Sequence, residues 1–404
     1  MLDASRRTAL GVLASCFVLG LAGRGIGETF VVFVLPLSHG FGWDRASVAS
    51  IYSVSMLANG LAGPMVGRLF DRSGPRTVYV LGLLLVGGAM SSAPYADALW
   101  QFRLCLGLGV GVGTACLGNV PNSALVSRWF KSHLATAMSI VYSAFGIGIL
   151  TLVPLAQLLN QTLGWRTAYQ WLGGGVLAVT VPIALLPWRR FRAGRADLAP
   201  RAEGPTARAD VLSIAHALRH PAFWGLFAVF WFTSVGMFTV VVQIVAYLVE
   251  IGFAPMQAAT AWGFSGVLLP MGMLVVGWLD GVIGRRASVL LAYGVTLFGM
   301  ALLWLLSRFP SIWLLGAFVV CFGGTLGSRG PLISAIAMRL FRGGHAATIF
   351  GMITIGSGLG AALGSWLGGS LHDWTHSYDA GFALAFASIV CGIVPFFTIA
   401  ALRH

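Results

Sequence analysis

The sequence has few charged residues, and nearly all of its basic residues are arginines. Only 9% of its 404 residues are charged and 57% are apolar, whereas soluble chains carry roughly 25% charged residues. Lysine occurs once, at Lys131, and there are only 12 acidic residues. A chain of this composition has too little polar surface to enclose its apolar residues in water, which excludes a soluble enzyme or binding domain.

Cysteine and catalytic groupings are also scarce. All five cysteines fall inside apolar stretches, without the spacing of a zinc site or a disulfide framework. We find no serine–histidine pair, paired acids or metal cluster at bilayer depth, so an intramembrane enzyme is not indicated. No metal and no cofactor are expected. The cysteines are Cys16, Cys105, Cys116, Cys321 and Cys391.

Long apolar stretches are what the sequence has instead. Most exceed about 17 residues, the length that a helix needs to cross a ~30 Å hydrocarbon core. The sequence therefore predicts an all-α membrane protein with twelve transmembrane helices. The predicted spans are residues 8–37, 46–69, 77–93, 99–126, 135–159, 167–187, 222–249, 256–279, 287–307, 313–338, 347–371 and 380–402.

The placement of the cations explains the net charge of +13 without a nucleic-acid partner. With a cytoplasmic N-terminus, nineteen cations fall on the inner side, and only Arg45, Arg166 and Arg308 fall on the outer side. This is the positive-inside asymmetry of a correctly oriented multi-pass protein. We expect a bacterial inner-membrane protein with both termini in the cytoplasm and no nucleic-acid partner.

One long polar segment divides the chain. Residues 189–220 hold seven arginines with Pro200, Gly204 and Pro205, a composition typical of a linker. We expect a cytoplasmic linker there, between an N-terminal six-helix bundle, residues 1–188, and a C-terminal one, residues 221–404.

The two predicted halves repeat the same landmarks. Residues 67–76, after the second span, are matched by residues 277–286 after the eighth, and Pro121 in the fourth span is matched by Pro331 in the tenth. Both offsets are 210 residues. Duplication of this kind builds a transport site at the interface of two moving halves.

Two segments resemble signatures of the major facilitator superfamily: residues 67–76, with an acid followed by Arg-x-Gly-x-Arg, and Arg103 with the glycines of residues 107–113. Residues 128–138 are similar to the segment that enters helix 5 in monocarboxylate transporters and oxalate/formate antiporters. The resemblance implies the major facilitator fold, two pseudo-symmetric six-helix bundles with helices 1, 4, 7 and 10 around a central cavity.

Four charges are predicted inside the bilayer, namely Arg24, Glu28, Arg103 and Arg329. A charge near mid-bilayer costs at least ~2.5 kcal/mol on insertion scales, so each is a functional hypothesis. Arg24 and Glu28 are one helical turn apart and can pair. They form either a structural ion pair or, as we favour, an anion-binding cation and the acid that couples transport to protons.

Arg329 aligns with Asn119 in the repeat. It forms either an ion pair near the inner gate or a second carboxylate clamp facing Arg24, because a guanidinium group binds carboxylates bidentately. Two cations around one small anion suit a mono- or dicarboxylate. The polar residues expected beside them are Asn119, Asn122, Tyr142, Ser143, Gln243, Thr354 and Ser357, with Tyr52 and Asn59 as further cavity residues.

The loop signatures are expected to control conformational switching without touching the substrate. Their acids can accept hydrogen bonds from the positive ends of neighbouring helices, and their arginines can pair with acids or anionic lipid. Arg103 is expected to have a structural or gating role rather than a substrate contact. The gating group is Asp71, Arg72, Arg76, Arg103, Asp280, Arg285 and Arg286.

The sequence thus predicts a carrier for a small organic anion, proton-coupled or exchanging, that works as a monomer surrounded by membrane lipid. One alternative is an efflux pump for hydrophobic, drug-like compounds, which would tolerate the loss of both Arg24 and Arg329. Another is a non-transporting membrane sensor or scaffold. That alternative would normally need a soluble signalling domain, and the longest polar segment, residues 189–220, is only 32 residues.

Overall fold

The computed structural model describes residues 2–126, 128–130, 134–193, 214–328, 333, 336, 340 and 346–399, and helices are the only regular secondary structure in these ranges. Ten helical segments within them are long and apolar enough to cross a membrane. Helices satisfy their own backbone amides, which lipid cannot do. The prediction of an all-α membrane protein is confirmed.

The second and tenth predicted spans are not among those ten segments. The second is α3, Arg45–Ser73, whose 29 residues reach about 43 Å at 1.5 Å per residue, but which is more polar than the others. The tenth is described as a helix only over Ile312–Gly323, because most of the remaining prediction lies outside the described residues. With these two, described helices fall in all twelve predicted spans.

Several spans consist of more than one helical element. The elements of the first six spans and the segment after them are α1 (Leu2–Gly20), η1 (Leu21–Gly25), η2 (Glu28–Val32), α2 (Val34–Phe41), α3 (Arg45–Ser73), α4 (Pro75–Ser92), η3 (Ala93–Tyr95), α5 (Leu99–Phe102), η4 (Arg103–Gly109), α6 (Val110–Leu117), α7 (Asn119–Val126), α8 (Leu134–Leu163), α9 (Trp165–Leu185) and α10 (Trp188–Ala193). Those of the remaining chain are α11 (Ile214–Arg219), α12 (Pro221–Val241), α13 (Ile244–Glu250), α14 (Pro255–Val282), α15 (Arg285–Leu306), α16 (Ile312–Phe318), η6 (Val319–Gly323), α18 (Ala346–Thr375), α19 (Asp379–Ile393) and α20 (Pro395–Thr398).

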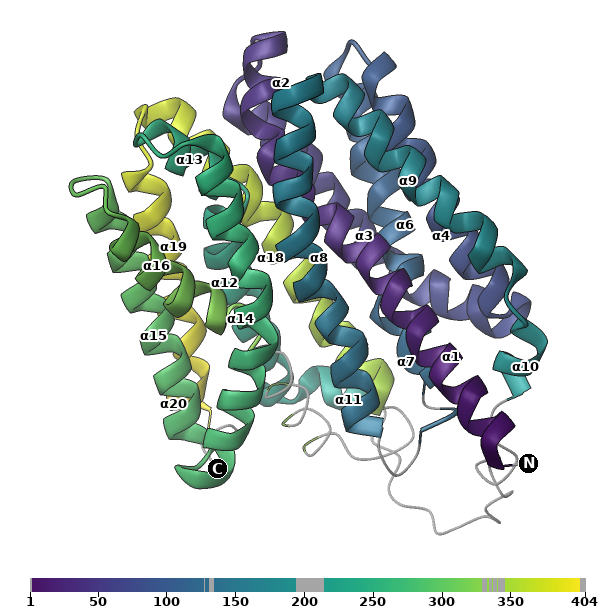
Figure 1. Ribbon diagram of the computed structural model, residues 1–404. Helices are drawn as coiled ribbons and strands as arrows, with labels where there is room; N and C mark the ends of the chain where they lie inside the picture. Colours follow the sequence, from purple (N-terminus) through teal and green to yellow (C-terminus); the bar gives the residue numbers. More distant parts are fainter. Residues whose placement is uncertain are drawn as a thin grey trace.

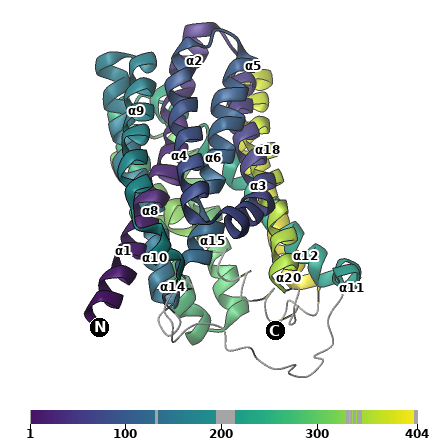
Figure 2. The same cartoon turned by 90° about the vertical axis from the view of Figure 1, so that its right-hand side faces the viewer.

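The helices form two bundles that stand side by side (Figure 1). In the turned view, the bundle of α1 to α10 lies in front of the bundle of α12 to α20 (Figure 2). The two meet where α3 packs against α18 and α8 packs against α14. These contacts are equivalent under the repeat, because α3 corresponds to α14 and α8 corresponds to α18.

The backbone geometry repeats at the offset that the sequence predicts. Gly74, between α3 and α4, and Gly284, between α14 and α15, both have a φ of 81°, in the left-handed region that favours glycine. Phe33 in the first span has φ and ψ of −94° and −6°, and Gln243 in the seventh has −94° and −7°. Both pairs are 210 residues apart. The pseudo-symmetry is therefore one of fold as well as of sequence.

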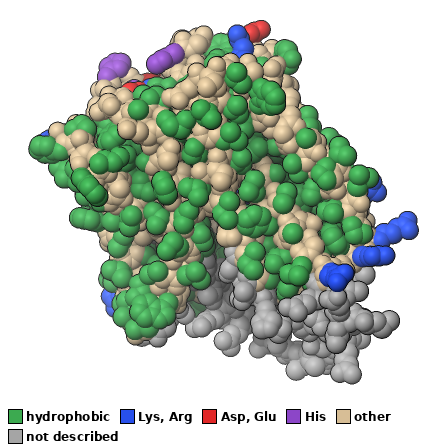
Figure 3. Space-filling view, in the orientation of Figure 1, with side chains coloured by type: hydrophobic (Ala, Val, Ile, Leu, Met, Phe, Trp, Pro, Cys, Tyr) green, Lys and Arg blue, Asp and Glu red, His purple; other side chains and the backbone are tan. Residues whose placement is uncertain are grey.

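Hydrophobic side chains cover the side wall of the molecule, and charged side chains and histidines lie toward its upper and lower ends (Figure 3). On α14, for example, Leu274 and Trp278 are each 66% exposed. A protein with such an exposed apolar surface would aggregate in water, but this surface is the expected contact for lipid chains.

The two halves touch through a pair of glycines where α8 crosses α14. A Cβ atom on Gly146 would lie 1.8 Å from the carbonyl oxygen of Gly266, and a Cβ atom on Gly266 would lie 2.0 Å from the carbonyl oxygen of Gly146. Small residues allow helix backbones to approach closely in membranes. This contact leaves no room for a side chain at either position.

Replacing Gly266 with alanine should therefore destabilise the protein by about 1–3 kcal/mol, because the methyl group forces α8 and α14 apart. Gly277→Ala on the same helix is the matched control, since a Cβ atom there meets nothing within 4 Å. Thermal unfolding of the two purified variants measures the difference. Equal melting temperatures would contradict the close crossing of α8 and α14.

Candidate functional site

The first span is irregular where its two charges lie. After α1 the chain forms a π-helical turn, η1, that holds Arg24, and then a 3-10 turn, η2, that begins at Glu28. The fourth and tenth spans contain the π-helical turns η4 and η6, and the seventh is interrupted at Gln243. Irregular turns in membrane helices are frequent at functional sites. They occur here in spans 1, 4, 7 and 10, the same four that the family resemblance places around a central cavity.

Glu28 is a buried acid that faces a tyrosine. Its residue is 5% exposed, and the hydroxyl of Tyr52 on α3 lies 3.3 Å from each of its two carboxylate oxygens. The ring of Tyr52 packs against Phe238 on α12, in the other half, with the ring centroids 6.1 Å apart. Tyr52 therefore connects the buried acid to the opposite bundle.

Arg24 is half-buried and acts on Glu28 electrostatically from a distance, without forming an ion pair with it. Its guanidinium carbon lies 5.0 Å from the ring centroid of Phe145 on α8, next to the glycine at which α8 crosses α14. Among the described side chains, no ion pair joins Arg24 to Glu28. Pairing at this spacing requires a regular α-helical turn, and η1 and η2 replace that turn. The structure thus differs from the structural ion pair that we considered, and the cation keeps a contact with an aromatic face instead.

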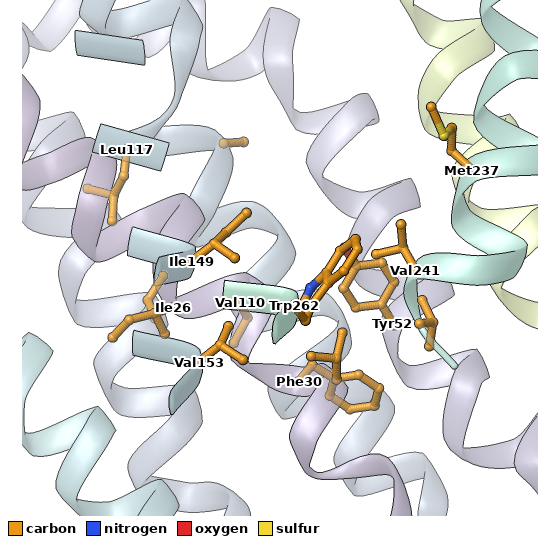
Figure 4. Close-up of a cluster of buried hydrophobic side chains, with 14 of the residues drawn as sticks. Ile26, Phe30, Tyr52, Val110, Leu117, Ile149, Val153, Met237, Val241 and Trp262 are labelled. Carbon is orange, nitrogen blue, oxygen red and sulfur yellow. The ribbon is translucent and has the colours of Figure 1, made fainter. Parts of the chain in front are cut away.

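Apolar and aromatic side chains from both halves surround this region. Figure 4 shows Phe30, Tyr52, Val241 and Trp262 in one buried cluster. The rings of Phe30 and Tyr52 lie 5.8 Å apart between centroids, and Trp262 reaches the cluster from α14. Low polarity around a few charged groups strengthens their electrostatic interactions with a ligand.

Gln243 is a buried polar residue of the C-terminal half whose side chain forms no hydrogen bond within the described residues. It is 2% exposed, and neither its amide nitrogen nor its amide oxygen has a hydrogen-bond partner within the described residues. It lies at the interruption between α12 and α13. A buried amide is expected to be completed by a partner such as a ligand or water, so the prediction that Gln243 contacts substrate stays open and is favoured by this geometry.

Asn122, in contrast, is already bonded inside the N-terminal half. It accepts a hydrogen bond from the Tyr79 hydroxyl at 2.9 Å and donates one to the carbonyl of Leu117 at 3.1 Å. Asn59 likewise donates to the Thr114 hydroxyl at 2.9 Å. In this conformation both amides hold helices together, as polar side chains commonly do in membranes.

The predicted cavity residues of α8 and α18 are half-buried. The hydroxyls of Ser143 and Thr354 donate to carbonyls of their own helices, and the Ser357 hydroxyl lies 2.8 Å from that of Ser234 on α12. Tyr142 is half-buried on α8. Within the described residues, no hydrogen bond joins these four predicted residues to Arg24 or Glu28, and their substrate roles remain predictions.

Arg329 lies outside the described residues, so the second carboxylate clamp stays a prediction. Asn119, Asp280 and Arg285 belong to α7, α14 and α15, but their side chains are outside the described set.

The other residues of the loop signatures lie at helix junctions. Asp71, Arg72 and Arg76 are exposed where α3 ends and α4 begins. The guanidinium carbon of Arg286 lies 4.9 Å from the ring centroid of Phe397. This arrangement is compatible with a role in switching and gives none of them a place in the buried region.

Arg103 lies at the start of η4, four residues after the fourth span begins at Leu99. It is exposed, and its Nε donates a hydrogen bond to the hydroxyl of Ser50 on α3 at 2.9 Å. The contact is within the N-terminal half. It supports the expected structural role and gives no sign of a substrate contact.

A charged cluster that the sequence analysis did not identify joins the halves at the end away from the chain termini. The Arg45 guanidinium forms an ion pair with Glu250 at the end of α13. The Asp373 carboxylate accepts hydrogen bonds from the backbone amides of Arg45 and Ala46 at 2.9 and 2.7 Å, so α18 caps the start of α3. His372 lies 3.8 Å from both acids. We call Arg45, Glu250, His372 and Asp373 the Arg45 cluster.

The cluster is tightly packed. Arg45 is 6% exposed, and a Cβ atom on Gly369 of α18 would lie 2.6 Å from the Arg45 carbonyl oxygen. The partners of Arg45 are 205 and 328 residues away in the chain. The only signal in the sequence was that opposite charges stand at the same ends of the second, seventh and eleventh spans.

The groups of the buried region suit binding better than covalent chemistry. They offer a half-buried cation, a buried acid bonded to a hydroxyl, and an amide without partners. Within the ranges described, no three His, Cys, Asp or Glu side chains are arranged to hold a metal ion. Such a set can attract an anion and exchange a proton.

Comparison with known proteins agrees with this arrangement. Residues 13–365 match the profile of the family described as Major Facilitator Superfamily. The chain is 25% identical over 346 residues to "Uncharacterized MFS-type transporter YcxA" of Bacillus subtilis, covering 84% of this chain and 83% of that relative.

Vertebrate relatives match over a similar length. The chain is 28% identical to "Monocarboxylate transporter 13" of Bos taurus, covering 94% of this chain and 87% of the relative. It is 25% identical to "Monocarboxylate transporter 12-B" of Danio rerio, covering 97% of this chain and 87% of the relative.

Proposed function

Since the chain belongs to the Major Facilitator Superfamily and is thus a membrane transporter rather than an enzyme, we propose that it moves a small organic anion, a mono- or dicarboxylate, across the bacterial inner membrane. Transport occurs by alternating access, and it is proton-coupled or proceeds by exchange. The observation that carries the proposal is the placement of Arg24 and Glu28 in irregular turns of one helix, without an ion pair between them.

Arg24 supports an anionic substrate. Its guanidinium group lies against the ring of Phe145 at 5.0 Å and acts on Glu28 only at a distance, so its hydrogen-bond donors can bind a carboxylate with two parallel hydrogen bonds. Relatives named monocarboxylate transporters favour the same class of ligand. A pump for uncharged hydrophobic compounds would have no use for a buried cation, although the aromatic surroundings would suit its substrates.

Glu28 supports coupling to protons. It is a buried carboxylate that accepts a hydrogen bond from the Tyr52 hydroxyl, and Tyr52 contacts the opposite bundle through Phe238. A change of charge at Glu28 is therefore positioned to alter the contact between the moving halves. Ionisable residues in such positions form proton relays in transporters.

The orientation is part of the proposal. Nineteen cations on one side and three on the other indicate cytoplasmic termini, and α1 begins at the same end of the molecule at which α20 lies (Figure 1). The Arg45 cluster is then on the outer side. We propose that this cluster holds the outer side closed, and that the protein works as a monomer in lipid.

Replacing Arg45 with glutamine should open the outer side. The Arg45 side chain is 7% exposed and that of Glu250 is 36% exposed, so solvent screens the pair in part. Losing this charged contact should cost about 1–3 kcal/mol, which shifts a two-state population toward the open form by roughly 5- to 150-fold. Spin labels at the outer ends of α3 and α18, in a cysteine-free background, should show a longer distance in the variant than in the parent protein.

Arg166→Gln is the control for this experiment, because Arg166 is a 57% exposed arginine whose contact with Asp97 is 3.9 Å long. Its distance distribution should match that of the parent protein. An unchanged distribution in Arg45→Gln would show that the Arg45 cluster does not hold the outer side closed.

The transport proposal itself is tested in proteoliposomes with a panel of labelled carboxylates. An inward proton gradient, or an opposing gradient of the unlabelled acid, should drive accumulation of at least one of them. Failure of all carboxylates, together with transport of an uncharged hydrophobic compound, would replace this proposal with the efflux alternative.

A further inference from the structure

Trp262 carries a buried hydrogen-bond donor that nothing in the described part of the chain satisfies. The residue is 1% exposed, and its indole Nε1 has no hydrogen-bond partner. Buried tryptophan N–H groups usually find an acceptor. A phenylalanine would fill such a space without leaving a donor unbonded, so packing alone does not account for an indole at this position.

The repeat gives Trp262 a counterpart in the other half. Trp262 is the eighth residue of α14, and Tyr52 is the eighth residue of α3, 210 residues earlier in the chain. Tyr52 places its hydroxyl on the buried acid Glu28. The pseudo-symmetry thus places one hydrogen-bond donor from each half at equivalent positions, and only the donor of the N-terminal half has an acceptor.

The side chain points to the interior between the bundles. Figure 4 shows Trp262 in the same cluster as Phe30 and Tyr52 of the N-terminal half. On its other side its ring lies 6.5 Å, between centroids, from that of Phe322 in η6. Trp262 therefore stands between the irregular turn of the tenth span and the buried region that holds Glu28.

Gln243 lies at the same depth. It precedes the end of α13 by seven residues, and Trp262 follows the start of α14 by seven, so both lie about 10 Å below the turn that joins these helices. α13 and α14 pack against each other. The C-terminal half thus offers an indole donor and an amide, both buried and both without partners among the described residues.

We propose that the indole N–H of Trp262 binds the transported anion, as the donor that the C-terminal half contributes opposite Tyr52. This rests on the proposed function. An indole N–H only donates, so it recognises an acceptor oxygen at the end of the substrate remote from the carboxylate that Arg24 binds. The site then prefers a dicarboxylate over an alkyl monocarboxylate of the same length.

The test compares the binding of succinate and butyrate to the purified full-length protein. Wild-type protein should bind succinate more tightly than butyrate, and Trp262→Phe should lower this preference about tenfold, the effect of losing one hydrogen bond to a charged group. Trp262→Tyr restores a donor of the kind found at Tyr52 and should keep most of the preference. Trp313→Phe, at an 85% exposed tryptophan, is the matched control and should leave it unchanged.

A second measurement observes the native Trp262 side chain directly, without replacing it. The indole ¹⁵N–H resonance of Trp262, assigned with Trp262→Tyr, should shift on addition of succinate and not on addition of butyrate. Three results would overturn the role of Trp262 while leaving the anion carrier intact. The preference for succinate could be unchanged in Trp262→Phe, the affinity for both acids could fall equally, or the indole resonance could fail to shift on addition of succinate. Binding of neither acid by wild-type protein would overturn the preference for a dicarboxylate, whereas the anion carrier itself is overturned only if the whole panel of carboxylates fails.

Discussion

Proton-driven accumulation of the substrate should disappear when Glu28 is replaced by glutamine, while exchange of labelled for unlabelled substrate continues. Glutamine has the same size, and its carbonyl oxygen can still accept a hydrogen bond from Tyr52, which lies 3.3 Å from the carboxylate in the native protein. It cannot take up or release a proton, however. Translocation of the loaded carrier thus remains possible, whereas the coupling to the gradient is lost.

Two assays in the same proteoliposomes separate these effects: uptake under an imposed pH gradient, and counterflow without one. Asp97→Asn is the control, since the Asp97 side chain is 85% exposed and its charge should have no part in coupling. Accumulation at the wild-type level in Glu28→Gln would contradict the coupling role. Loss of counterflow as well would assign Glu28 to binding or folding instead.

Replacing Arg24 with glutamine should weaken the binding of carboxylates on the order of 100-fold, because the loss of one partner in a buried charged contact has effects of about 2–5 kcal/mol. The guanidinium has no carboxylate partner among the residues described. Glu28 loses the distant charge of Arg24 but keeps its hydrogen bond from Tyr52, so the variant should fold. Equilibrium binding of labelled acid and its counterflow measure the effect.

Arg308→Gln is the matched control, because Arg308 is an exposed arginine beyond the end of α15. It should bind and exchange carboxylates like the wild-type protein. The Arg24 variant also decides between the two transport classes. Undiminished transport by Arg24→Gln would contradict an anion carrier and would favour the efflux of hydrophobic compounds.

The architecture could be predicted because it depends on local properties of the chain. Apolar length fixed the spans, and the glycines and basic residues that follow the second and eighth spans fixed the repeat. Gly74 and Gly284 illustrate this point: the residues were recognisable as a matched pair, and the structure gives both a φ of 81°. The second span, α3, is more polar than the ten apolar segments, and one of its faces meets α18 of the other half.

The site was less predictable, for three physical reasons. The structure buries Glu28, as expected, and leaves Arg24 half-buried. Their spacing predicts pairing only on a regular α-helix, whereas η1 and η2 change the turn between them. The Arg45 cluster depends on contacts across 205 and 328 residues, which no local pattern reveals. The unbonded N–H of Trp262 is a property of its packed surroundings, and a lone tryptophan in an apolar span gives no signal of it.

We propose that Arg24 and Glu28 serve one shared binding region for an anion. The most direct test is thermal unfolding of the purified protein with a series of carboxylates and their uncharged amides, at several pH values. We predict that at least one carboxylate raises the melting temperature in a pH-dependent way, that its amide does not, and that Arg24→Gln abolishes the effect. Stabilisation by the amides as strong as that by the acids, or stabilisation that persists in Arg24→Gln, would contradict the account.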